Sequence, residues 1–222
     1  EGIDFRSEDK LLTTEEIFRL IKLTSKMGVS KIRFTGGEPL LRKDLSELVQ
    51  FAHQCEGIES VHLTTNGLLL SKRIKELEKS GLSGINISLD TLDTDKFKKI
   101  TRRDGLDMVL NSLQKALASN IQSIKLNIVA MRDFNDDELM DFVELTKEND
   151  ITVRFIELMP FDSHQIWQTG KFYGADDIVA DIKKQVDALK PIDGSRTEHH
   201  IFRVNDYKGK VAVIPAYSRS LC

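Results

Sequence analysis

The feature that most restricts the fold of this chain is a repeated couplet, in which a helical pattern of apolar residues is followed by a strand pattern. The couplet occurs five times before Pro160, at intervals of about 25 to 40 residues. Parallel strands need long crossover connections, which are usually helices. The couplets therefore predict an α/β fold with a parallel sheet, either a TIM-like barrel or a doubly wound sheet. The strands are expected at residues 31–35, 61–64, 85–90, 124–129 and 153–159.

Several of the expected helices carry start signals. Thr13 and Glu16 have the spacing of a capping box at the start of the first helix. Ser71 is expected to cap the helix before the third strand. Asn135 and Glu138 are expected to cap the helix before the fifth strand.

Beyond Pro160 the couplets give way to a different pattern. Residues 163–174 are expected to form a loop, and a helix is expected at 178–186. Two apolar segments on either side of Lys208 and Gly209 are typical of an antiparallel hairpin. No low-complexity stretch separates this tail from the couplets. We therefore divide the chain into a barrel, residues 1–162, and a C-terminal extension, residues 163–222, that packs on the barrel.

Composition argues against several classes of partner. Lys and Arg number 32 against 35 Asp and Glu, so the formal net charge is -3, and both signs are spread along the chain. Such a chain has no basic face for nucleic acid. It also has no apolar run near the roughly 18 residues that a membrane span requires. We expect a small-molecule partner, with no nucleic acid and no membrane.

The cysteines and the ends of the sequence carry further information. Cys55 and Cys222 are the two cysteines and lie far apart, so we expect neither a disulfide framework nor a metal-spaced pair. The sequence opens at Glu1 without Met and stops directly after an apolar strand. We expect it to be a segment of a longer protein.

Polar residues recur at the C-terminal ends of the expected strands. In a parallel α/β fold these ends open onto the ligand cleft. The alternative is that such residues cap the following helices, which is the preferred interpretation for Asp90. Taken together, the set predicts one polar site. Its members are residues 35–38, 64–66, Asn86, Ser88, Asp90, Lys125, Asn127, Arg154, Glu157 and Met159.

The first expected strand runs directly into Gly36, Gly37, Glu38 and Pro39. Glycine has no Cβ, so a backbone with two glycines can approach a ligand closely. Glu38 places a carboxylate where it can accept hydrogen bonds from an ammonium group, and Pro39 fixes the turn. Without further context, such a tetrad is more often an ordinary surface turn.

Five motifs in order give that context. The tetrad resembles the GGEP motif with which the radical S-adenosylmethionine superfamily binds the amino group of the cofactor's methionine. With the other motifs, the chain resembles the GTP 3′,8-cyclase family of molybdenum cofactor biosynthesis, closely over residues 2 to about 162 and loosely beyond. The motifs lie at residues 11–16, 32–42, 63–67, 85–92 and 154–161.

The resemblance implies a more specific fold. It implies an incomplete TIM-like parallel barrel of the radical S-adenosylmethionine type, (β/α)6, with a β-containing C-terminal extension. A segment before Glu1 would contribute the first strand, so five full-length parallel strands are expected in this chain.

The resemblance also implies which residues bind the cofactor. Gly36, Gly37, Ser88 and Met159 would contact S-adenosylmethionine. Glu38 would bind its methionyl ammonium group. The chemistry is suitable, because a carboxylate attracts an ammonium ion and the Ser88 hydroxyl suits a ribose or a carboxylate.

The same resemblance places GTP on a second set of residues. Arg33 and Lys125 are the cations that a triphosphate or a guanine carbonyl favours. Arg154 is a further candidate for binding a carboxylate or a phosphate, although a structural ion pair with Glu157 is an equal alternative. The residues implied to contact GTP are Arg33, Thr64 and Lys125, with Asn127 and Arg154 as additional candidates.

The sequence departs from the family in its cysteines. The family holds one 4Fe-4S cluster with a C-x3-C-x2-C motif just before the equivalent of Glu1, and a second with a C-terminal set whose first member Cys222 resembles. A cluster normally needs three or more ligands. Neither of the family's two clusters is therefore expected on these 222 residues, and Cys55 is expected to be a plain thiol.

The implied function is that of a radical enzyme in its full-length form. S-adenosylmethionine would be cleaved reductively, and the resulting radical would abstract a hydrogen atom from the GTP ribose to start cyclisation. The product would pass to a pterin-forming partner, cyclic pyranopterin monophosphate synthase. The enzyme is expected in the cytoplasm of a bacterium or the mitochondrial matrix of a eukaryote, and a homodimer is open. The alternatives are a non-catalytic nucleotide-binding module that has lost its cluster, or a radical enzyme acting on another substrate.

Overall fold

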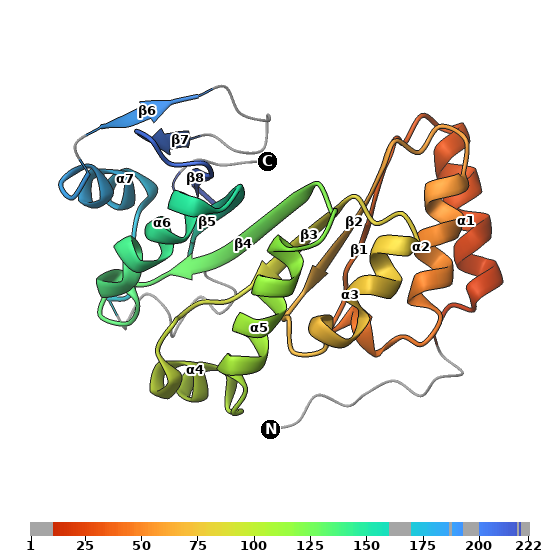
Figure 1. Ribbon diagram of the computed structural model, residues 1–222, viewed down its shortest axis with the longest axis horizontal. Coiled ribbons are helices and arrows are strands. Elements are labelled where there is room, and N and C mark those ends of the chain that lie inside the picture. Colours follow the sequence, from red (N-terminus) through yellow and green to blue (C-terminus); the bar gives the residue numbers. More distant parts are fainter. Residues whose placement is uncertain (1–10, 160–169, 187, 193–199, 217, 219–222) are drawn as a thin grey trace.

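A single sheet forms the frame of the chain (Figure 1). The computed structural model describes residues 11–159, 170–186, 188–192, 200–216 and 218. Within them the strand order is β1-β2-β3-β4-β5-β8-β7-β6. The strands are β1 (Lys31–Phe34), β2 (Ser60–Thr65), β3 (Gly84–Ser88), β4 (Ser123–Ala130), β5 (Ile151–Glu157), β6 (Leu189–Pro191), β7 (His200–Val204) and β8 (Lys210–Ile214).

Helices connect the strands in the expected alternation. The α-helices are α1 (Thr14–Lys26), α2 (Leu45–Gln54), α3 (Leu70–Lys79), α4 (Thr94–Thr101), α5 (Leu106–Leu117), α6 (Leu139–Glu148) and α7 (Ala175–Lys183). Two short 3-10 helices, η2 (Pro39–Leu41) and η3 (Asp136–Glu138), follow the ends of β1 and β4. No helix among the described residues is long and apolar enough to cross a membrane.

The pairing confirms the predicted parallel core and shows where the extension goes. Strands β1 to β5 pair in sequence order, each parallel to the next. Strand β8 then pairs with β5, also in parallel, while β7 and β6 continue the sheet in antiparallel orientation. The predicted hairpin of β7 and β8 is therefore correct. Its second strand supplies a sixth parallel strand, so the C-terminal extension continues the sheet of the barrel.

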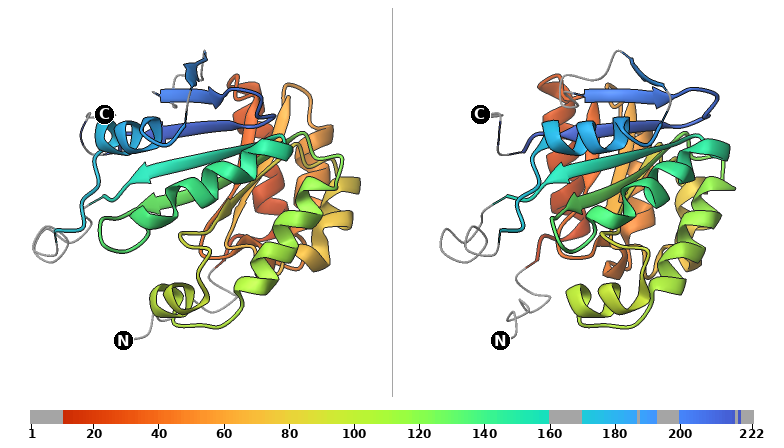
Figure 2. Two further views of the ribbon diagram at one scale, coloured as in Figure 1. Left: turned by 60° about the vertical axis from the view of Figure 1, so that its left-hand side comes forward. Right: turned by 90° about the vertical axis from the view of Figure 1, so that its left-hand side faces the viewer.

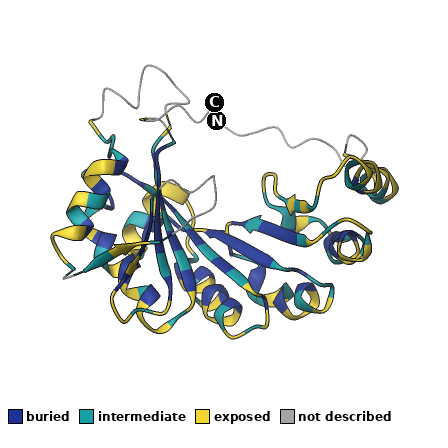
Figure 3. Cartoon of the chain, turned by 90° about the horizontal axis from the view of Figure 1, so that it is seen from above, coloured by how far each residue is buried: buried dark blue, intermediate teal, exposed yellow. Residues whose placement is uncertain are grey.

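The two faces of the sheet differ in what covers them. On β4, Ile124, Leu126 and Ile128 are buried, whereas the alternate residues Lys125 and Asn127 are only half-buried. The buried side packs under helices, which line one side of the curved sheet in Figure 3. Within the described part of the chain, no helix covers the other side. We call that side the concave face.

The extension packs closely against the end of the barrel. Helices α6 and α7 lie on the same side of the sheet (Figure 2). The rings of Phe142 on α6 and Phe155 on β5 meet edge to face, 6.2 Å apart. The Gly209 N–H donates to the Thr146 carbonyl at 2.8 Å. A Cβ at Gly209 would lie 2.4 Å from the Ile151 carbonyl oxygen, so only glycine fits in this turn.

The predicted helix starts are partly right. The capping box of Thr13 and Glu16 is confirmed, with both reciprocal hydrogen bonds present. The predicted cap at Ser71 is wrong, because α3 already begins at Leu70 and the Ser71 N–H donates to the Ser112 hydroxyl of α5 at 2.9 Å. Helix α4 lies in a stretch for which no helix was expected.

Candidate functional site

Two rows of polar side chains cross the concave face. Register partners on neighbouring strands share a face of the sheet and lie about 4.8 Å apart, so three partners span roughly 10 Å. The rows bring together residues that the sequence assigns separately to GTP and to S-adenosylmethionine. The first row is Thr64, Asn86 and Lys125, and the second is Ser88, Asn127 and Arg154.

Positive charges gather around a neutral histidine next to these rows. Arg33 on β1 is the register partner of His62 on β2, and Lys31 shares their face. Burial, followed by the positive charges of Lys31, Arg33 and Lys125, lowers the pKa of His62 to about 4. The imidazole is therefore neutral near pH 7. Three cations that act on one buried ring form a site suited to an anion.

The imidazole of His62 occupies the space above a glycine. A Cβ on Gly84 would lie 2.4 Å from the His62 Nδ1 atom. The ring therefore forms part of the floor of the concave face. His62 and Lys31 were not predicted as site residues. Their signal was the two-residue period, which puts Lys31 with Arg33 and His62 with Thr64 on one face.

The loop after β1 leaves open space beside its two glycines. Gly36 has φ of +153°, which favours glycine. Gly37 has no such conformation, and a Cβ at either residue would meet no described atom within 4 Å. The conformation and packing of the described residues thus give no reason for glycine at Gly37. Close approach of a ligand to the backbone would give one.

Glu38 ties this loop to the end of β2. Its Oε1 accepts hydrogen bonds from the Leu40 N–H at 3.0 Å and the Thr65 hydroxyl at 2.7 Å. Its Oε2 accepts from the Asn66 N–H at 2.8 Å. A carboxylate has about four acceptor positions, so one further donor can be bound. Glu38 therefore holds the loop in place and keeps capacity for one ligand contact.

An arginine braces the same loop from the helix side. Arg73 on α3 donates from Nη1 to the carbonyl oxygens of Leu40 at 3.1 Å and Arg42 at 2.7 Å. Both carbonyls belong to η2 or the residue that ends it. The turn after Glu38 is thus fixed by Arg73 on one side and by β2 on the other.

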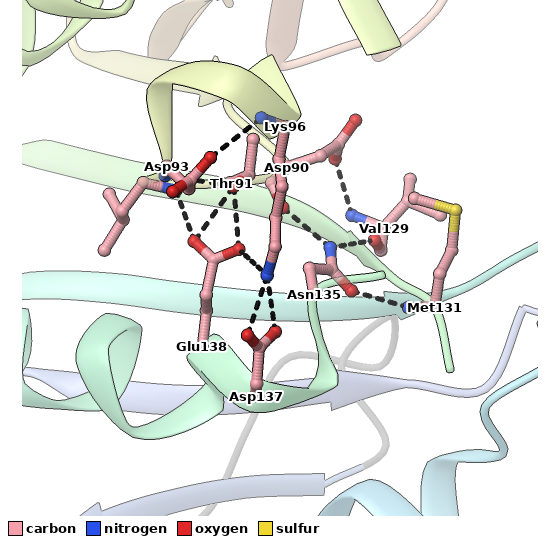
Figure 4. A network of polar contacts seen from close by, with 10 residues as sticks. Asp90, Thr91, Asp93, Lys96, Val129, Met131, Asn135, Asp137 and Glu138 are labelled. Carbon is pink, nitrogen blue, oxygen red and sulfur yellow. Dashed lines mark hydrogen bonds and ion pairs between the residues drawn. The ribbon is translucent and has the colours of Figure 1, made fainter. Parts of the chain in front are cut away.

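A buried carboxylate fixes the segment after β3 (Figure 4). Glu138 accepts hydrogen bonds from the Thr91 hydroxyl at 2.7 Å, the Leu92 N–H at 2.6 Å and the Lys96 ammonium at 3.0 Å. Lys96 also contacts Asp137 at 2.6 Å. The prediction that Glu138 helps to cap a helix is wrong, because its carboxylate bonds instead to the segment that follows Ser88.

Asn135 makes a second link in the same network (Figure 4). Its Nδ2 donates to the carbonyl oxygens of Asp90 at 2.6 Å and Val129 at 2.9 Å, and its Oδ1 accepts from the Met131 N–H at 2.8 Å. Asn135 makes no side-chain capping bond, so that prediction is also wrong. The carboxylate of Asp90 accepts from the Val129 N–H at 2.8 Å, and burial raises the pKa of Asp90. These bonds join the ends of β3 and β4 and hold the second row in register.

Comparison with known families agrees with this geometry. Residues 3–146 match the family described as Radical SAM superfamily, and residues 151–222 match Molybdenum Cofactor Synthesis C. The chain belongs to the radical SAM superfamily.

Curated relatives cover the whole of this radical SAM chain. The GTP 3′,8-cyclase of Chlorobaculum tepidum is 47% identical over 219 residues, which are 99% of this chain and 66% of the relative. Molybdenum cofactor biosynthesis protein 1 of Dictyostelium discoideum is 43% identical over 230 residues, covering 100% of this chain and 36% of the relative. The chain therefore spans just under two thirds of the first relative and about a third of the second.

A solved structure supports the fold. The structure of TYW1 with a bound lysine-pyruvate adduct matches with a TM-score of 0.61 and 21% sequence identity, covering 88% of this chain and 67% of that one. The prediction of a partial TIM-like barrel with a C-terminal extension is thus confirmed.

Strand β5 of the radical SAM barrel carries Arg154 and Glu157, for which an ion pair was one alternative. Arg154 lies on the concave face, whereas Glu157, three positions later, faces the helices and is buried. Glu157 accepts hydrogen bonds from the Ala175 N–H at the start of α7, at 2.6 Å, and from the Ser218 hydroxyl, also at 2.6 Å. Their positions on opposite faces of β5 argue against the alternative of a structural ion pair between Arg154 and Glu157. Met159, two residues beyond β5, is 38% exposed.

The described residues do not fit an iron-sulfur cluster. Among them, no group of three or more His, Cys, Asp or Glu side chains is arranged to hold a metal. Cys55 caps the C-terminal end of α2, where its Sγ lies 3.6 Å from the Ser25 hydroxyl of α1. The predicted ligand of the second cluster, Cys222, lies outside the described residues.

Proposed function

We propose that this radical SAM chain binds GTP and S-adenosylmethionine in a GTP 3′,8-cyclase. The enzyme would convert GTP into (8S)-3′,8-cyclo-7,8-dihydroguanosine 5′-triphosphate in molybdenum cofactor biosynthesis. The observation that carries the proposal is the group of Lys31, Arg33 and Lys125 around His62, on the face that also bears the glycine loop. The names of the curated relatives support the choice of reaction.

GTP is assigned to the cationic part of the concave face. Arg33 and Lys125 attract the triphosphate, because both are positively charged. Both charges also lower the pKa of His62, so they act on the same part of the face. Thr64 lies in the same row as Lys125, with one strand between them, and offers a hydroxyl. Asn127 and Arg154 extend the site towards β5.

S-adenosylmethionine is assigned to the neighbouring strand ends. Gly36 and Gly37 offer open backbone, Glu38 has capacity for the methionyl ammonium, and Ser88 and Met159 lie at the ends of β3 and β5. When bound, S-adenosylmethionine supplies the chemistry that removes a hydrogen atom from the GTP ribose. The chain's own residues hold the two nucleotides side by side, which is how proteins usually assist such cofactors.

We assign the family's two 4Fe-4S clusters to ligands other than the described residues, with Cys222 as one ligand of the second. The 222 residues alone are then inactive. The product passes to cyclic pyranopterin monophosphate synthase, in the bacterial cytoplasm or the mitochondrial matrix.

The proposal is tested by product analysis with the whole gene product. Under anaerobic reducing conditions, GTP and S-adenosylmethionine should give the cyclised nucleotide, identified by mass spectrometry. Replacing Arg33 by Ala should lower kcat/KM for GTP at least about 10-fold, the value of one charge-assisted contact. Replacing Arg19, an exposed residue on α1, should change nothing. Cleavage of S-adenosylmethionine that leaves GTP unmodified would reject the proposed reaction.

A further inference from the structure

Among the buried polar atoms of the concave face, three that lie on neighbouring strands have no hydrogen-bond partner among the described residues. They are His62 Nδ1 on β2, Asn86 Oδ1 on β3 and Asn127 Oδ1 on β4. Buried polar atoms in folded proteins are nearly always hydrogen-bonded. Three exceptions on neighbouring strands of one face indicate a place that a ligand completes.

Asn86 is the most deeply buried member of this group. Its residue is 1% exposed, yet its Oδ1 accepts no hydrogen bond from the described residues. It lies between Thr64 and Lys125 in the first row, and its side chain shares a face with Ser88 two positions later. Asn86 therefore occupies the boundary between the residues proposed for GTP and one proposed for S-adenosylmethionine.

The chemistry of a carboxamide limits what Asn86 can bind. Its oxygen only accepts hydrogen bonds, and the oxygens of an ionised triphosphate also only accept. The Oδ1 atom therefore needs a donor, and the donors of GTP are its ribose hydroxyls and the N–H groups of its base. Of these, the ribose carries the hydrogen atom that is removed, so it must lie next to S-adenosylmethionine.

We infer that Asn86 accepts a hydrogen bond from a ribose hydroxyl of the substrate nucleotide and so fixes the sugar at the boundary between the two nucleotide sites. The inference rests on the proposed function. It adds a substrate-positioning residue to Arg33, Thr64 and Lys125, which act mainly on other parts of GTP. In the free protein the buried Oδ1 atom has no hydrogen-bond partner among the described residues, which lowers the stability of the fold. The bond to the ligand would remove this cost.

The test compares nucleotides that lack single groups. Affinities of the whole gene product for GTP, 2′-deoxy-GTP, 3′-deoxy-GTP and inosine triphosphate are measured by calorimetry. Replacing Asn86 by Ala should weaken GTP about 2- to 10-fold, the value of one neutral hydrogen bond. It should have no further effect on one of the two deoxynucleotides, which already lacks the bond. The matched control is Asn111→Ala, at an exposed position on α5.

A second variant separates binding from folding. Asn86→Leu has a similar shape and removes a buried oxygen that has no described partner, so its melting temperature should equal or exceed that of the wild type. Its affinity for GTP should fall as in Asn86→Ala. Unfolding of Asn86→Leu would show a structural role and overturn the inference.

The measured affinities can also overturn the assignment of Asn86 to the ribose. Equal affinities of wild type and Asn86→Ala for GTP would overturn the inference alone. So would a loss for Asn86→Ala that is the same for both deoxynucleotides but absent for inosine triphosphate, since this would assign Asn86 to the base. If the wild type bound no GTP, the proposed function itself would fail.

Discussion

Replacing His62 by Gln is expected to remove an acid-sensitive component of stability. The pKa of His62 falls from an ordinary 6.5 to about 4 through burial and the charges of Lys31, Arg33 and Lys125. A tenfold change in proton affinity is worth about 1.4 kcal/mol, so complete shielding from water would give about 3 kcal/mol. Water that reaches part of the ring screens the charges, and we expect about 2 kcal/mol.

The sign of the effect follows from proton linkage. The unfolded chain binds a proton at His62 near pH 6.5, whereas the folded chain binds it only near pH 4. The contribution is therefore fully present above pH 6.5 and is lost as the pH falls from 6.5 to 4. Urea unfolding at several pH values should show a steeper loss in the wild type than in His62→Gln.

The same histidine reports on the anion site directly. Tripolyphosphate bound to the concave face would offset the three cations, so the pKa of His62, followed by NMR, should rise when this anion is added. The matched control for both experiments is His53→Gln, an exposed residue on α2, which should keep the wild-type pH dependence. Parallel pH profiles for wild type and His62→Gln, or a His62 pKa indifferent to tripolyphosphate, would refute this description of the site.

Further predictions concern the glycines, the buried network and the cysteines. Gly209→Ala should destabilise the fold by about 2 kcal/mol or more in urea unfolding, because its Cβ would lie 2.4 Å from the Ile151 carbonyl oxygen. Gly37→Ala should leave stability within about 0.5 kcal/mol and weaken binding of S-adenosylmethionine, so retained binding would remove Gly37 from the site. Glu138→Ala should cost about 1 to 3 kcal/mol, because the buried Thr91 hydroxyl would lose its acceptor, while Asp137→Ala at a side chain 68% exposed should cost under about 1 kcal/mol. The 222-residue polypeptide alone should show no cluster absorbance after anaerobic reconstitution, because it has two cysteines, and a stoichiometric four-iron cluster would contradict that count.

Local pattern predicted the parallel strands because each strand shows its own periodicity. On β4, alternation between Ile124, Lys125, Leu126 and Asn127 identifies both the strand and its two faces. The place of β8 beside β5 could not be read in this way. That pairing joins distant parts of the chain, and nothing in the sequence of β8 specifies its neighbour.

The wrong helix caps have the same physical origin. Asn135 and Glu138 have the spacing of a cap, but the hydroxyl that Glu138 binds belongs to Thr91, 47 positions earlier. A short spacing in the sequence is compatible with either use, and the tertiary contact decides. The role of His62 in the site was not predictable for a similar reason, because the cations that keep it neutral come from two other strands.

Part of the candidate site follows from sequence alone. Arg33, Thr64, Ser88 and Lys125 do meet on one face, as residues at the ends of parallel strands should. Their separate roles towards GTP and S-adenosylmethionine stay predictions. The unpaired oxygen of Asn86 was not predictable, because burial without a partner is a property of the folded chain.

Calorimetric titration of GTP tests the central claim, that the cations of the concave face bind the substrate. The whole gene product is compared with Lys125→Ala and with Lys75→Ala, which removes an exposed lysine of α3 on the helix side. One charge-assisted contact is worth about 1.5 to 3 kcal/mol, so Lys125→Ala should bind GTP about 10- to 100-fold more weakly and Lys75→Ala as tightly as the wild type. Equal affinities for all three proteins would contradict the claim.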